Sequence, residues 1–471
     1  MNSAVIETHL KNCYAKVFSG REFDLKDLEE SFLAMAPILG KNSWDYARRR
    51  LPAEIENHPK IYLVSTKNQL NKIDVRVNNW RRVKTESRRR FSYYNQVLNC
   101  LAFQISSDAD IDDLINNFLA LGKNFKIHYL KDDHFDPSQN ARFYWDEIFN
   151  KSAVINIAER PVYFVSSNLH SLVNLTGGFV YHFQNEIFNF AEKQLPDLAA
   201  DWEKIKTTNN ILRVNDFLYY LSKKYFEANP AKLKEKKDYE YRLGFIQIEP
   251  RDYIEAEIQI LPLKAVASSQ FLDPFLQLTK TKKLTDSSAI IVNIEYPLGL
   301  TAYFALRELL GRLKNLRGIY LMGKAAILAG EIGDVQIPTV VYDERSDQTF
   351  EFNNIFNGNF PRTALQSKIL NHQKAVSVYS TFLENLEQLK QYHQNGFNLI
   401  EMESGPYLRA IKEKFSDLNH LPFDFGIVNY ASDNPLSQTL GEGPLNLRGI
   451  EPTYLAALAI VQRIIEQELN N

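Results

Sequence analysis

The sequence contains little cysteine, and Cys13 and Cys100 are the only two among its 471 residues. Two cysteines cannot form a disulfide framework, so we expect a reducing compartment. Long hydrophobic runs are also missing, and no apolar run is long enough to cross a bilayer. The first residues include Glu7, Lys11 and Lys16, which do not fit the apolar core of a signal peptide. We therefore expect a cytoplasmic protein with no membrane contact.

An excess of charge of either sign is missing as well. The 55 Lys and Arg residues are balanced by 57 Asp and Glu residues, which gives a net charge of -2. This balance argues against binding of nucleic acid or membranes over the whole surface. No His or Cys cluster has metal-ligand spacing, and neither a P-loop nor a nucleophile elbow occurs. We therefore expect no metal or other cofactor.

The stretch that predicts the fold most clearly lies between residues 287 and 338. An apolar run at 289–294 precedes a helical stripe at 302–313, and a second apolar run covers 319–322. Strand, helix and strand in this order form a βαβ unit, and such runs suit an α/β fold with a mainly parallel sheet flanked by helices. Ligands bind at the carboxyl ends of parallel strands. We therefore expect site loops at 296–299 and 323–328.

Four motifs follow one another in the last part of the chain. They are Met-Gly-x-Ala at 322–325, Ile-Gly-Asp-Val-x-Ile-Pro at 332–338, Glu-Met-Glu-Ser at 401–404 and Ser-Asp at 432–433. In this order they resemble the nucleoside phosphorylase and nucleosidase superfamily, and 432–436 is similar to AMP nucleosidases. The resemblance covers 287–471. It implies cleavage of the N-glycosidic bond of a purine nucleoside or nucleotide, by hydrolysis or, alternatively, with phosphate as in the phosphorylases.

The resemblance also implies roles for individual residues. Asp433 matches the general acid that protonates the base, and it needs burial to do so because the pKa of a free Asp is about 3.9. Glu403 matches the carboxylate that binds the ribose hydroxyls, with Met402 beneath the sugar. Phe382 matches an aromatic residue that stacks on the base. The other positions that we place at the site are Glu401, Gly323, Ser432 and Tyr296.

Ordinary structural roles remain open for several of these residues. Asp433 could belong to a turn, Phe382 to the core, and Glu401 to the first turn of a helix. Lys324 departs from the superfamily pattern, because Gly-Lys-Ala-Ala at 323–326 replaces Gly-x-x-Gly-Gly. Its ammonium could bind phosphate or an anionic group of the substrate, or it could extend into solvent. The altered glycine loop leaves a non-catalytic nucleotide-sensing module as another function.

The rest of the chain is interpreted from its patterns alone. Residues 1–153 predict a mostly helical region, and 154–471 predict the α/β domain with a helical insertion near 181–242. Short strands are expected at 154–157 and 161–165, and the polar residues 166–171 either contribute to the site or cap a helix. The basic run 81–90 suits phosphate or RNA, but we favour a solvated helix face, because charge runs are usually solvated. We expect a homo-oligomer that binds a small nucleoside or nucleotide.

Overall fold

The computed structural model describes residues 61–64, 127–130, 137–207, 210–249, 254, 256–277, 281–297, 299–360, 368–378, 386–436 and 447–470. In the first 136 residues, the described elements are strands β1 (Ile61–Val64) and β2 (Ile127–Leu130), which pair in parallel. The predicted helices of this region and its basic run lie outside the described residues. The division at residue 153 stays a prediction.

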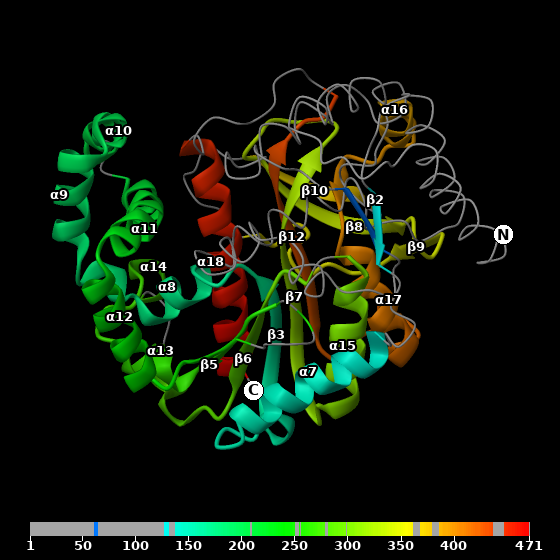
Figure 1. Ribbon diagram of the computed structural model, residues 1–471, viewed down its shortest axis with the longest axis horizontal. Helices are drawn as coiled ribbons and strands as arrows, with labels where there is room; N and C mark the ends of the chain where they lie inside the picture. The colour runs from blue at the N-terminus through cyan, green and yellow to red at the C-terminus, as the bar shows by residue number, and fades with distance from the viewer. Residues whose placement is uncertain are drawn as a thin grey trace.

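A ten-stranded sheet forms the centre of the protein (Figure 1). Strand β3 (Pro161–Ser167) lies between β6 (Ile290–Glu295) and β7 (Asn315–Ile327) and runs parallel to both. Beyond β6 come β5 (Ile258–Pro262) and β4 (Ile246–Ile248). Beyond β7 come β12 (Asp424–Asp433), β8 (Val335–Asp343), β10 (Ile369–Ser377) and β11 (Leu399–Glu401), and β9 (Gln348–Glu351) pairs with β8.

The sheet closes on itself because β11 pairs with β7 as well as with β10. The β11–β7 and β12–β8 pairs are antiparallel, as are the pairs that involve β4, β5 and β9. The α/β class is therefore confirmed, but the expectation of a mainly parallel sheet is wrong. The sheet is mixed and partly closed, since β7 continues beyond Gly323 to Ile327 and reaches β11.

Helices cover both faces of the sheet (Figure 1). One face packs against α7 (Pro137–Lys151), α15 (Leu300–Arg312) and α17 (Ser404–Phe415). The Trp145 indole of α7 donates a 2.8 Å hydrogen bond to the Ala305 carbonyl of α15, which ties α7 to this layer. The other face packs against α8 (Ser171–Gly177) and α18 (Leu447–Asn470). Side chains of β3 alternate between the two cores, so the strand is buried on both faces.

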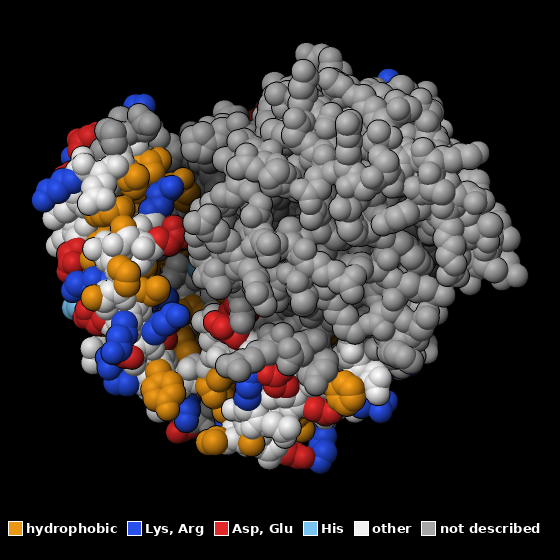
Figure 2. All heavy atoms as spheres, viewed as in Figure 1, with side chains coloured by type: hydrophobic (Ala, Val, Ile, Leu, Met, Phe, Trp, Pro, Cys, Tyr) orange, Lys and Arg blue, Asp and Glu red, His pale blue; other side chains and the backbone are white. Residues whose placement is uncertain are grey.

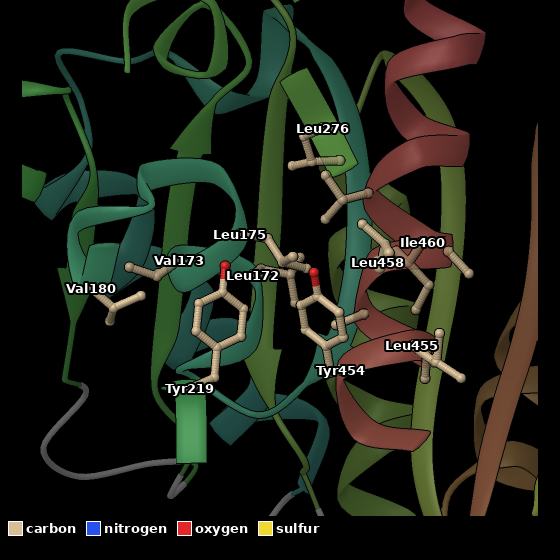
Figure 3. Packing of buried hydrophobic residues seen from close by; sticks show 14 of the residues in the cluster. Leu172, Val173, Leu175, Val180, Tyr219, Leu276, Tyr454, Leu455, Leu458 and Ile460 are labelled. Carbon is tan, nitrogen blue, oxygen red and sulfur yellow. The ribbon is translucent and has the colours of Figure 1, made fainter. Parts of the chain in front are cut away.

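A helical layer lies beside α18 and corresponds to the predicted insertion. It contains α9 (Gln184–Gln194), α10 (Pro196–Lys206), α11 (Ile211–Ala228) and α12 (Pro230–Arg242). Figure 3 shows Tyr219 of this layer and Tyr454 of α18 within one apolar core. The hydroxyls of Tyr219 and Tyr454 each donate a 2.8 Å hydrogen bond to the buried Asp273 carboxylate. The Tyr181 hydroxyl donates a third bond to it, at 2.9 Å. Three hydroxyls thus surround this buried carboxyl and hold the layer against α18.

Positive and negative side chains are mixed on the exposed face of the helical layer. Figure 2 shows basic and acidic side chains interspersed over it, and Lys232 lies 3.3 Å from Glu235 and 3.8 Å from Glu186. The remaining described elements are short helices and 3-10 turns: η5 (Ile157–Glu159), η6 (Phe179–Tyr181), α13 (Lys264–Ser268), α14 (Pro274–Gln277), η7 (Thr281–Asp286) and α16 (Leu386–Gln394).

The strand expected at 154–157 is wrong, because Asn156 adopts a positive φ of 55° and a turn leads into η5. In the described part of the chain, no helix has the length and apolar character of a membrane span.

Candidate active site

Several strand ends lie level with one another at one end of the sheet. Ser166 of β3 is paired with Ile294 of β6 and with Leu321 of β7. Gly323 of β7 is paired with Asn429 of β12. The β11–α17 connection reaches the same end, since the Gly299 amide hydrogen-bonds the Glu403 carboxyl. The loop after β6 and the Glu401–Glu403 segment therefore meet.

Glu401 starts helix α17. Its side chain is 4% exposed, and its carboxylate accepts the backbone N–H groups of Glu403 at 2.8 Å and Ser404 at 2.7 Å. The Ser377 hydroxyl donates to the same carboxylate and accepts the Gly405 N–H at 2.7 Å. These bonds satisfy the first amides of the helix, where a negative charge is also favoured by the helix dipole. Glu401 therefore has the structural role that the sequence left open for it.

Glu403 differs from Glu401 although only one residue separates them. The residue is partly exposed, yet its carboxyl is desolvated. Burial, together with the nearby Glu401 charge, raises the pKa of Glu403 to about 8, while the Gly299 amide and the Arg345 guanidinium lower it. Burial raises the pKa of Glu401 as well, although the Ser377 hydroxyl and the N–H groups of Ser404 and Glu403 lower it, so the two carboxyls titrate together.

Tyr296 lies in the loop that follows β6, as predicted. Its backbone has a φ of 26°, a value that is rare for a residue with a side chain and that often marks a functional site. The Tyr296 hydroxyl is buried and has no hydrogen-bond partner among the described residues, although Asn168 and Tyr430 lie beside it. Gly299 ends the loop with a φ of 55° and places its amide toward Glu403.

Gly323 and Lys324 lie within a strand, so the expected loop at 323–328 is wrong. Glycine at 323 leaves room for Asn429, because a Cβ there would lie 2.3 Å from the Asn429 Oδ1 atom and this side chain would have to move. The Lys324 side chain is exposed. Its role as an anion ligand stays a prediction.

The other predicted positions divide into described and undescribed side chains. Met402 is buried in an apolar cluster with Val378 and Leu389, and the Ser432 hydroxyl donates to the Ala325 carbonyl at 3.0 Å. Phe382 and the Asp433 side chain lie outside the described part of the structure. The Asp433 backbone ends β12 opposite Ala326.

Sequence reasoning missed the polar side chains of Arg345 and Tyr407 near Glu403, whereas Asn168 belongs to the polar stretch 166–171 that it had singled out. Arg345 lies in the turn between β8 and β9, and its guanidinium donates a 3.4 Å hydrogen bond to the Met402 carbonyl. Asn168 accepts the N–H groups of His170 at 3.1 Å and Ser171 at 2.8 Å, so the polar residues after β3 do cap a helix. Tyr407 is fully buried in α17. The only feature of the sequence that could have pointed to Tyr407 is its polar hydroxyl within an otherwise apolar helical stripe. No group of three or more His, Cys, Asp or Glu side chains suited to a metal occurs in the described ranges.

The fold and site define an α/β protein with a mixed, partly closed sheet and an unequal pair of glutamates at the strand ends. The chain belongs to the family of unknown function DUF6909, whose model matches residues 31–122 and 117–466. A comparison with curated proteins found no match.

Solved structures similar to this chain include nucleosidases. A putative methylthioadenosine nucleosidase from Weissella paramesenteroides is 14% identical, with a TM-score of 0.34, over 47% of this chain and 88% of that one. A putative 5'-methylthioadenosine/S-adenosylhomocysteine nucleosidase from Borrelia burgdorferi, bound to adenine, is 10% identical with a TM-score of 0.35, over 64% and 99%. A Helicobacter pylori mutant enzyme with 5'-methylthioadenosine in its active site is 9% identical with a TM-score of 0.36, over 65% and 99%.

Proposed function

We propose that this protein hydrolyses the N-glycosidic bond of a purine nucleoside or nucleotide. The observation that carries the proposal is the unequal environment of two neighbouring carboxyls. Glu401 alone is sufficient to start α17, because it accepts the first amides of that helix. Glu403 is not needed for the cap, yet its desolvated carboxyl is held at the strand ends by the Gly299 amide. Desolvated carboxyls with a shifted pKa are typical of functional sites.

In this proposal each residue has the role that the motif resemblance implies. Glu403 binds the sugar hydroxyls, Asp433 protonates the leaving base, and Phe382 stacks on that base. Cleavage of a glycosidic bond passes through an oxocarbenium-like transition state with positive charge at the sugar. Carboxyl groups held close to that charge stabilise it.

A panel of purine nucleosides and their monophosphates, each with and without phosphate, tests the proposal. Hydrolysis predicts free base and free sugar in the absence of phosphate. Release that requires phosphate would identify a phosphorylase, and tight binding without release would identify a nucleotide-sensing module. Glu403→Gln should remove the activity, whereas Glu351→Gln, which changes an exposed glutamate of β9, should not. Cytoplasmic location and homo-oligomer formation stay predictions.

A further inference from the structure

Helix α17 contains a tyrosine hydroxyl that is buried without a partner. Tyr407 is 0% exposed, and its hydroxyl forms no hydrogen bond within the part of the chain that the structure describes. The ring is fixed in place, packing edge-on against Phe164 of β3 at 5.9 Å and 68°. A buried hydroxyl without a partner costs about 1–3 kcal/mol, and Phe would fill the same space without this cost. The hydroxyl therefore needs an explanation.

Two polar groups lie beside the Tyr407 hydroxyl. Ser166 is two residues beyond Phe164 and so lies on the same face of β3. Its side chain is 3% exposed. Glu403 precedes Tyr407 by one helical turn, and the Tyr407 N–H donates to the Glu403 carbonyl at 3.0 Å. Burial raises the pKa of Tyr407 far above neutrality, the neighbouring Ser166 hydroxyl lowers it and a Glu403 charge raises it, so the phenol stays protonated. A buried hydroxyl donor thus lies near a second hydroxyl and a carboxyl.

We propose that Tyr407 and Ser166 bind the water molecule that attacks the sugar, an inference that rests on the hydrolysis proposed above. Buried waters typically make about three hydrogen bonds to polar groups that are otherwise unsatisfied, and these two hydroxyls with Glu403 supply three. A phosphate dianion is disfavoured at the same place, because it would approach the Glu401–Glu403 pair. The inference thus favours water over phosphate as the second substrate.

The step balances with groups that the proposal already names. The water oxygen forms a bond to the anomeric carbon as the bond from that carbon to the base nitrogen breaks. The electron pair of the broken bond leaves with the base, which takes a proton from the general acid. The proton lost by the water passes to Glu403 in its ionised form, which becomes the main form only as the pH rises through about 8. The products are the free sugar and the free base.

Tyr407→Phe and Ser166→Ala test the inference, with Tyr163→Phe as the matched control. Tyr163 is equally buried but points to the opposite face of β3, where its hydroxyl donates to Glu468 at 2.9 Å. We expect Tyr407→Phe to lower kcat for base release at least roughly tenfold, the effect of about 1.4 kcal/mol, with KM changed less than about twofold. In water–methanol mixtures the variant should give a larger share of methyl glycoside, because it no longer selects water. Tyr163→Phe should change neither kcat nor this share.

Crystallography adds a measurement that does not depend on turnover. The wild-type protein should show a water about 2.7–2.8 Å from the Tyr407 hydroxyl, the usual O–H···O distance. The inference is overturned if that density is empty. It is also overturned if the wild type cleaves substrate while both site variants keep the wild-type kcat and methanol share; hydrolysis itself would then stand. If the wild type cleaves no member of the panel, the proposed function fails and this inference fails with it.

Discussion

The Glu401 carboxylate accepts the backbone N–H of Glu403 at 2.8 Å, so one glutamate of the motif positions the other. Glu401 fixes the point at which α17 begins, and that point determines where the Glu403 side chain leaves the backbone. The pair is therefore a helix cap followed by a second carboxyl that the cap does not use.

Glu401→Gln should lower the free energy of unfolding by about 1–3 kcal/mol. The N–H groups of Glu403 and Ser404 share one oxygen of Glu401, which a glutamine could replace with its own oxygen. The glutamine amide would then face the Ser377 hydroxyl, which donates to the other Glu401 oxygen, and the negative charge at the helix start would be lost. Urea denaturation of both proteins measures the difference, and Glu351→Gln is the exposed control. A loss no larger than that of the control would contradict the capping role.

Glu403 should make stability depend on pH. Its pKa in the folded protein is raised to about 8 from an ordinary value of 4.5, so the folded state retains a proton that the unfolded state has released. The stabilising contribution is complete below pH 4.5 and is lost as the pH rises through 8. Glu403→Gln keeps the neutral form at every pH, so its stability relative to wild type should increase from pH 5 to pH 9. A constant difference across unfolding curves at pH 5, 7 and 9 would exclude this titration.

Gly323→Ala should destabilise the protein by about 1–3 kcal/mol, because the new Cβ would lie 2.3 Å from the Asn429 Oδ1 atom. The double substitution Gly323→Ala with Asn429→Ala should recover much of the loss, since it removes the clashing atom. Gly311→Ala is the control, because no atom lies near its added Cβ and alanine favours a helix. Thermal unfolding of the four proteins measures these effects. Failure of the double variant to recover stability would show that the close approach is not the cause.

Lys324→Met tests the predicted anion ligand. The side chain is exposed on β7, and exposed charges are screened by water, so its loss should weaken binding of a nucleoside monophosphate by no more than about 1 kcal/mol. Calorimetric titration of the monophosphate and the neutral nucleoside separates the charge effect from other changes. Equal weakening of both ligands would assign Lys324 a role other than anion binding.

The sequence predicted strands where apolar runs were uninterrupted. Strands β3 and β6 were found in this way because β-branched and aromatic residues bury both faces. The pattern failed at β7, where Gly323 suggested the end of a strand. That glycine instead makes room for Asn429, a side chain more than a hundred residues away. Closure of the sheet could not be predicted either, because it depends on pairing between β7 and β11 rather than on any local pattern.

The site was predicted as a set of motifs but not as a division of roles. Two glutamates separated by one residue have the same sequence signal whether they cap a helix or bind a ligand. Only the bonds of Glu401 show which one caps α17. The Tyr407 hydroxyl gave almost no signal, because tyrosine in an apolar helical stripe also fits an ordinary core.

Release of free purine base by the wild type and by Asp433→Asn tests the central claim most directly. The substitution keeps the shape of the side chain but removes its carboxyl proton, and general acid catalysis typically contributes about 10²–10⁴-fold. Chromatography of reactions with the nucleoside and nucleotide panel should show base and sugar in equal amounts with the wild type. The rate should fall by about 10²–10⁴-fold in the folded variant. A folded wild-type protein that releases no base from any member of the panel, or a variant that releases it at the wild-type rate, would contradict this account.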